Sequence, residues 1–141
     1  MNYLVWSVVA MAAYSLVAPL MRLATAGTGA IPSTVAAFVS NTVLVFATLA
    51  VISVSGEGVV EHLGDPRMRY VVAAGVCLAV GIIAYYHALS LGRVSIVAPI
   101  FAMFFVASSA VGVVALDEPV TGRKLLGVGF AVVAVVLVAG E

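Results

Sequence analysis

The chain has 141 residues, of which 65% are hydrophobic and only 9% are charged. Because a soluble domain carries about 25% charged residues to keep its surface hydrated, this composition excludes a soluble fold, and most of the surface must face lipid. Six basic and six acidic side chains leave no net positive charge to attract nucleic acid. The single cysteine, Cys77, excludes an intrachain disulfide.

Five apolar segments follow one another along the chain, each close to the roughly 20 residues that a membrane-spanning helix needs. The predicted spans are Tyr3–Met21, Ser33–Ser53, Tyr70–Leu91, Val94–Leu116 and Arg123–Gly140. They lack the alternation of a barrel strand, and lipid offers the backbone no partners, so we expect helices. No Lys or Arg precedes the first segment, so a cleaved signal peptide is not expected. The prediction is an all-α polytopic membrane protein with one domain over residues 1–141.

The distribution of basic residues predicts the orientation in the membrane. Arg22 and Arg93 follow the first and third spans, on the side opposite the amino terminus. The other four basic residues fall on the side of the amino terminus: Arg67, Arg69, Arg123 and Lys124. Since basic residues concentrate in cytoplasmic loops, this distribution favours a cytoplasmic amino terminus.

Polar side chains inside the predicted spans suggest a pathway, because such residues are expensive in lipid. At 1.5 Å per residue, Asn41 lies about 12 Å deep, Tyr14 about 10 Å and His87 about 6 Å. We hypothesise that Tyr14, Asn41, Tyr86 and Ser108 help to line a substrate cavity, with His87 near its mouth. Alternatively, Asn41 is an interhelical hydrogen-bond pin and the tyrosines are interfacial belt residues. His87 either relays protons or is a hydrogen-bonded side chain near the interface.

Pro99 lies early in the fourth predicted span. It cannot donate to the helix ladder and clashes with the preceding turn, so we expect a bend or a loosened helix there. This kink is either passive or part of a gate.

One stretch of the second half carries a family resemblance. The sequence YYHALSLGRVSIVAP, residues 85–99, resembles the junction between the third and fourth helices of EamA-type repeats in the drug/metabolite transporter superfamily. Glu118 and Gly127 resemble the glutamate that ends the fourth helix and a glycine of the fifth. Glu118 is also interpreted as part of an interfacial charge cluster with Arg123 and Lys124. The resemblance covers essentially the whole chain and implies one five-helix repeat, half of a ten-helix inverted-repeat transporter.

The resemblance implies a transporter of small metabolites in a prokaryotic cytoplasmic membrane. One repeat holds half of a site, so a homodimer, favoured as antiparallel, or a heterodimer with an oppositely inserted paralogue is expected. Small multidrug-resistance proteins of this superfamily use a buried glutamate in the first helix, where this chain has Met11 and Tyr14. A neutral or zwitterionic substrate is therefore expected.

Two other classes of function compete with that of a transporter. A non-transporting accessory or structural membrane subunit is the alternative to a transporter. An enzyme is not expected, because paired-histidine metal motifs, serine elbows and phosphate-binding glycine loops are missing from the sequence. We accordingly predict no catalytic residues, no metal and no cofactor. The expected partners are the lipid bilayer, a small-molecule substrate and a second transporter chain.

Overall fold

The computed structural model describes residues 2–117 and 119–140, and all regular structure in these ranges is helical. Five helical segments are long and apolar enough to cross a membrane: Tyr3–Thr25, Ser33–Ser55, Met68–Leu91, Val94–Ala115 and Gly122–Ala139. The predicted all-α polytopic fold is confirmed. The largest difference in a boundary is at the end of the first segment, which continues to Thr25 instead of Met21.

The first segment is interrupted, which the sequence analysis did not predict. It consists of α1 (Tyr3–Ser15) and α2 (Val17–Thr25), which meet at Leu16. Pro19 has no backbone N–H, so it cannot donate to the carbonyl of Ser15. The Leu16 N–H donates to the Ala13 carbonyl, three residues back, at 3.3 Å. The helix therefore breaks in the turn before Pro19.

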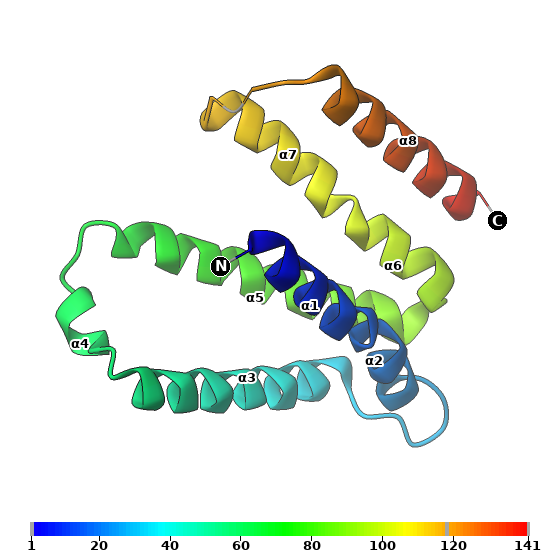
Figure 1. The fold of residues 1–141 in the computed structure, drawn as a ribbon. Coiled ribbons are helices and arrows are strands. Elements are labelled where there is room, and N and C mark those ends of the chain that lie inside the picture. Colours follow the sequence, from blue (N-terminus) through cyan, green and yellow to red (C-terminus); the bar gives the residue numbers. More distant parts are fainter. Residues whose placement is uncertain (1, 118, 141) are drawn as a thin grey trace. The chain divides into compact units, whose positions relative to one another are not determined.

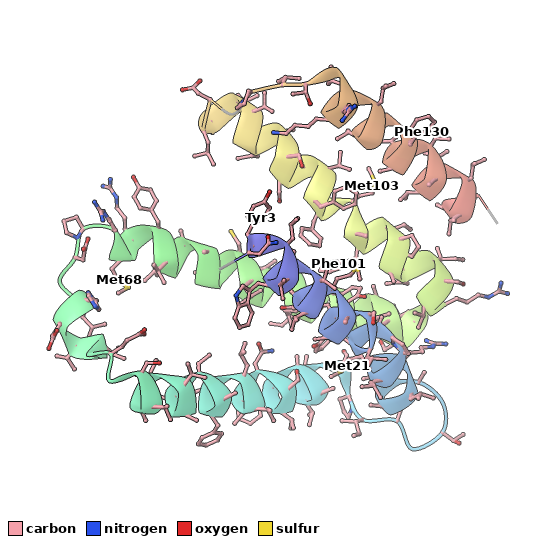
Figure 2. The ribbon with its side chains drawn as sticks, viewed as in Figure 1. Tyr3, Met21, Met68, Phe101, Met103 and Phe130 are labelled. Carbon is pink, nitrogen blue, oxygen red and sulfur yellow. The ribbon has the colours of Figure 1, made fainter. Side chains whose placement is uncertain are left out.

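The fourth segment is interrupted as well, one turn after Pro99. It consists of α6 (Val94–Ala102) and α7 (Phe104–Ala115), with Met103 between them (Figure 2). Pro99 lies inside α6 and cannot donate to the Ser95 carbonyl. The Met103 N–H donates to the Ile100 carbonyl at 3.1 Å, again three residues back. Local tightening of this kind accompanies a bend in a helix.

Residues 2–91 form one compact unit, built from α1, α2, α3 (Ser33–Ser55), α4 (Val59–His62) and α5 (Met68–Leu91). Figure 1 shows α3 and α5 running in opposite directions, with α4 in their connection. α5 packs against both α2 and α3. The buried apolar residues of this unit are Ala18, Ala36, Ala37, Tyr86 and Leu89. They come from α2, the start of α3 and the last turns of α5, so the tightest packing lies where these three helix ends meet.

The place where the end of α2, the start of α3 and the end of α5 meet is called the packed end. Arg22 of α2 makes a polar contact there. Its Nη1 donates to the Leu89 carbonyl at 2.8 Å and to the Ser90 carbonyl at 2.9 Å. α5 ends at Leu91, so both carbonyls belong to the last turn, which has no intrahelical donors. A cation at a helix carboxyl terminus also interacts favourably with the helix dipole. Arg22 therefore fastens α2 to the end of α5.

Residues 92–140 form the second compact unit, with α6, α7 and α8 (Gly122–Ala139). α8 packs against α6. It begins after Thr121, whose hydroxyl oxygen accepts from the Lys124 N–H at 3.3 Å, as expected of an N-cap threonine.

Few residues of the spans are buried within the chain itself. In the most apolar windows of the five spans, the buried share runs from 0% in α8 to 11% in α3. A helix that is hydrophobic all round and yet exposed needs lipid or another protein around it. Most of the helix surface is therefore available to the bilayer and to partner chains.

Leu89 and Leu91 offer a matched test of the packed end, since one is fully buried at 0% exposure and the other is 74% exposed. We expect Leu89→Ala to destabilise the protein by about 2 kcal/mol, the low end of the range for buried leucines, because it leaves a cavity. Leu91→Ala should change stability by less than about 0.5 kcal/mol. Unfolding in detergent, followed by circular dichroism, measures both; equal effects would contradict this description of the core.

Candidate functional site

A groove of about 570 Å³ runs between α3 and α5 and contains Asn41. Its polar side chains, Thr34, Asn41 and Thr42, all come from α3. The remaining lining residues are apolar: Ala37, Phe38, Val45, Phe46, Gly75, Leu78, Ala79, Ile82 and Ile83. The groove is thus an open, mostly apolar depression with one polar stripe, a composition that small-molecule sites share.

The wall contributed by α5 is hollowed by small residues. Gly75 and Ala79 lie one turn apart and both line the groove. A methyl group built on Gly75 would meet no atom within 4 Å, so the space in front of this glycine is open. Small residues at this spacing ordinarily allow two helices to touch; here the same spacing leaves room between them.

Asn41 is the polar side chain of the groove with the most unused hydrogen-bonding capacity. Its Nδ2 donates to the Ala37 carbonyl of its own helix at 2.8 Å. An asparagine amide has two N–H donors and an oxygen with two lone pairs. Within residues 2–117 and 119–140, this is the one hydrogen bond of the side chain. Its Oδ1 and second N–H therefore remain available to a molecule in the groove.

The threonine beside Asn41 is satisfied locally. The Thr42 hydroxyl donates to the Phe38 carbonyl at 2.8 Å. Such bonds to the preceding turn are how a hydroxyl in a membrane helix avoids being an unpaired donor. Thr42 still has its oxygen lone pairs, so it offers the groove an acceptor.

The other predicted site residues lie elsewhere. Tyr86 is buried at 5% exposure in the packed end, beside the ring of Tyr85. Tyr14 is 67% exposed on α1. His87 is exposed in the last turns of α5, where its carbonyl accepts from the Ser90 hydroxyl at 2.7 Å. None of the three lines the α3–α5 groove.

Ser108 belongs to the second unit and is exposed on α7. Its neighbour Ser109 lines a second groove, of about 660 Å³, between α7 and α8. The Ser109 hydroxyl donates to the Phe105 carbonyl of its own helix at 2.8 Å. The Lys124 ammonium, also in the lining of this groove, donates to the Pro119 carbonyl at 3.2 Å. Glu118, the predicted partner in a charge cluster, lies outside the described residues.

The sequence analysis missed two features of this region. Thr34 shares the groove with Phe38, Asn41 and Val45, at spacings of four, three and four residues. These spacings place residues on one face of a helix. The sequence around Asn41 was therefore enough to predict the polar stripe. The role of Arg22 could not be predicted from the sequence, because its partners are backbone carbonyls 67 and 68 residues away.

The fold and the groove define a multi-pass membrane protein with a polar stripe at membrane depth. The sequence matches the EamA-like transporter family over residues 1–140, and the chain belongs to this family. This confirms the resemblance drawn from residues 85–99. No curated protein and no solved structure matches the chain.

Cysteine labelling tests whether the groove is open to water. Ala79 and its neighbour Val80 are both exposed on α5, but of the two only Ala79 lines the groove. In a Cys77→Ser background, we expect Ala79→Cys to react with a charged, water-soluble thiosulfonate in intact membranes, because reaction requires a hydrated thiolate. Val80→Cys should remain unlabelled until the membrane is dissolved. Equal labelling of the two positions would contradict a hydrated groove.

Proposed function

We propose that this protein moves small neutral or zwitterionic metabolites across the membrane, working as a dimer by alternating access. Membership of a transporter family supports the general class. The observation that carries the proposal is Asn41, with unused hydrogen-bonding groups in an otherwise apolar groove. In lipid an unsatisfied polar group is costly, so an amide with free donors and acceptors at this depth supports a functional contact.

The chemistry of the groove favours uncharged groups at this point of the pathway. Its lining contains threonine, asparagine and apolar side chains, and no ionisable one. An ion in such an environment would lose its hydration without gaining a counter-charge. An amide such as that of Asn41 can instead exchange hydrogen bonds with a hydroxyl, amide or carbonyl of the substrate, while Phe38 and Ile82 contact its hydrocarbon part.

The odd number of spans and the low internal burial support the proposed dimer. Two five-span repeats of opposite orientation form an inverted pair with a site between them, the usual arrangement for alternating access. Exposed Tyr14 and Ser108 are proposed to join Asn41 in the cavity of such a pair, with Tyr86 supporting the wall and His87 at the mouth. An antiparallel homodimer and a heterodimer with a paralogue both satisfy this requirement.

The two helix breaks are proposed as the points of movement. At Leu16 and Met103 the regular ladder is replaced by a bond three residues back. Helices kink at positions where the ladder is interrupted in this way. Pro99, one turn before Met103, is the proposed gating residue.

Membrane orientation provides the first test. With five spans, the two termini of any one copy lie on opposite sides. For an antiparallel homodimer, we expect a reporter fused to the amino terminus to appear on both sides of a prokaryotic cytoplasmic membrane in comparable amounts, at native expression. If the amino terminus is found only in the cytoplasm, as the basic residues favour, the antiparallel homodimer is wrong. An oppositely oriented paralogue is then the partner to seek.

Asn41→Leu tests the substrate contact. Purified protein in liposomes loaded with a metabolite mixture should release selected components, detected by mass spectrometry. Loss of one hydrogen bond of about 1 kcal/mol should reduce the initial rate about fivefold. The matched control is Thr48→Val, because Thr48 is exposed on α3, bonds to its own helix and does not line the groove.

Two outcomes of this assay would count against the proposal. An unchanged rate for Asn41→Leu, with normal expression, would remove Asn41 from substrate handling. If a correctly assembled dimer releases no more metabolite than loaded liposomes without protein do, an accessory subunit is favoured instead.

A further inference from the structure

Arg22 has binding capacity that its structural role does not use. A guanidinium group carries five N–H donors in a rigid plane. Two contacts, both from Nη1, go to the carbonyls of Leu89 and Ser90. Among the described residues, nothing accepts a hydrogen bond from Nε or Nη2 of Arg22. The side chain is only partly buried, so these donors are not enclosed by the fold.

The unused donors form a geometric unit. The Nε–H and the nearer N–H of Nη2 point in the same direction and make a fork that matches the two oxygens of a carboxylate or phosphate. The two bonds from Nη1 hold the plane of the guanidinium in place. The long side chain is thus already ordered in the folded protein, so much of the entropy cost of ordering it does not oppose binding.

The charge of Arg22 is also left without a counter-ion in its unit. Its two partners are neutral carbonyls, which orient the guanidinium but do not cancel its charge. The acidic residues of the segment 2–91 are Glu57, Glu61 and Asp65, all between α3 and α5 at the far end of both helices. Arg22 lies in the last turn of α2, close to the start of α3 and the end of α5. A full positive charge therefore stands at this end of the unit with no carboxylate from residues 2–91 beside it.

We propose that Arg22 is an oxyanion-binding residue: its Nε and Nη2 donate to a phosphate or carboxylate at the membrane interface, while Nη1 holds the end of α5. A position in the last turn of a membrane helix is at the depth of lipid headgroups. Two sources supply the same chemistry, a phospholipid phosphate and the anionic group of a water-soluble zwitterion. Binding at this residue does not depend on whether the protein transports anything.

The test observes the guanidinium directly. Protein with ¹⁵N-labelled arginine is placed in maltoside micelles, which contain no phosphate, and the Nε–H resonances are recorded at constant ionic strength. The probes are inorganic phosphate and dihexanoyl phosphatidylglycerol, added in separate titrations. We expect the Arg22 resonance to move saturably at about tenfold lower probe concentration than that of Arg93, because a fixed fork binds an oxyanion better than a mobile one.

Arg93 is the internal control, since it is exposed and none of the described residues makes a hydrogen bond or ion pair with its side chain. Arg→Lys variants at positions 67, 69, 93 and 123 each remove one resonance and so assign it. The remaining resonance belongs to Arg22, so the test does not require Arg22→Lys to fold. Saturation by inorganic phosphate identifies a site for soluble oxyanions. Saturation by the lipid alone identifies a headgroup site. If neither probe moves Arg22 more readily than Arg93, the proposal is overturned.

Discussion

Two hydrogen bonds from Arg22 to the carbonyls of Leu89 and Ser90 join the first span to the third. In water, the last carbonyls of a helix can be left to solvent; near lipid they need partners from the protein. A guanidinium on α2 supplies two of them at once. The helices converge at this end, with Ala36, Ala37 and Leu89 buried there, and Ala37 also lines the groove between α3 and α5.

The groove and the packed end are two consequences of side-chain size along α3 and α5. Near the start of α3, Ala36 and Ala37 are small enough for the helices to touch and become buried. The larger side chains of Phe38 and Phe46 on α3 and the small residues Gly75 and Ala79 on α5 line the groove, together with Ala37 itself. Asn41 lies in this groove, where its free amide groups can meet a ligand. Close packing at Ala37 therefore leaves an accessible polar group about one turn away.

Low internal burial connects the fold to the proposed mechanism. A soluble domain of this length buries most of its apolar surface in its own core, whereas these spans bury at most 11% of their most apolar windows. In a bilayer that exposure carries no hydrophobic penalty, because lipid tails are as apolar as leucine. A second chain can consequently cover the exposed faces of the helices. The helix breaks at Leu16 and Met103 add points at which such an assembly can bend.

The sequence by itself determined the number of spans, their helical character and the family. Lipid permits few ways to satisfy a backbone, so runs of about 20 apolar residues already specify helices. Their ends were predicted to within a few residues because Gly92, Pro32 and the polar stretch near Asp65 interrupt the apolar pattern. Asn41 was identified as a candidate for the same reason: one amide in a long apolar run is conspicuous.

Other features were decided by the tertiary structure alone. A single sequence does not show which face of a helix meets protein, so the proposed convergence of Tyr14, Tyr86 and Asn41 rested on depth only. In the structure, Tyr86 is buried, Tyr14 is exposed, and only Asn41 lines the α3–α5 groove. The two hydrogen bonds from Arg22 could not be predicted from the sequence either. Every residue has the same backbone carbonyl, and no side-chain pattern marks Leu89 and Ser90 as acceptors. Which carbonyls a distant arginine reaches depends on how two helices cross, and that is a property of their packing.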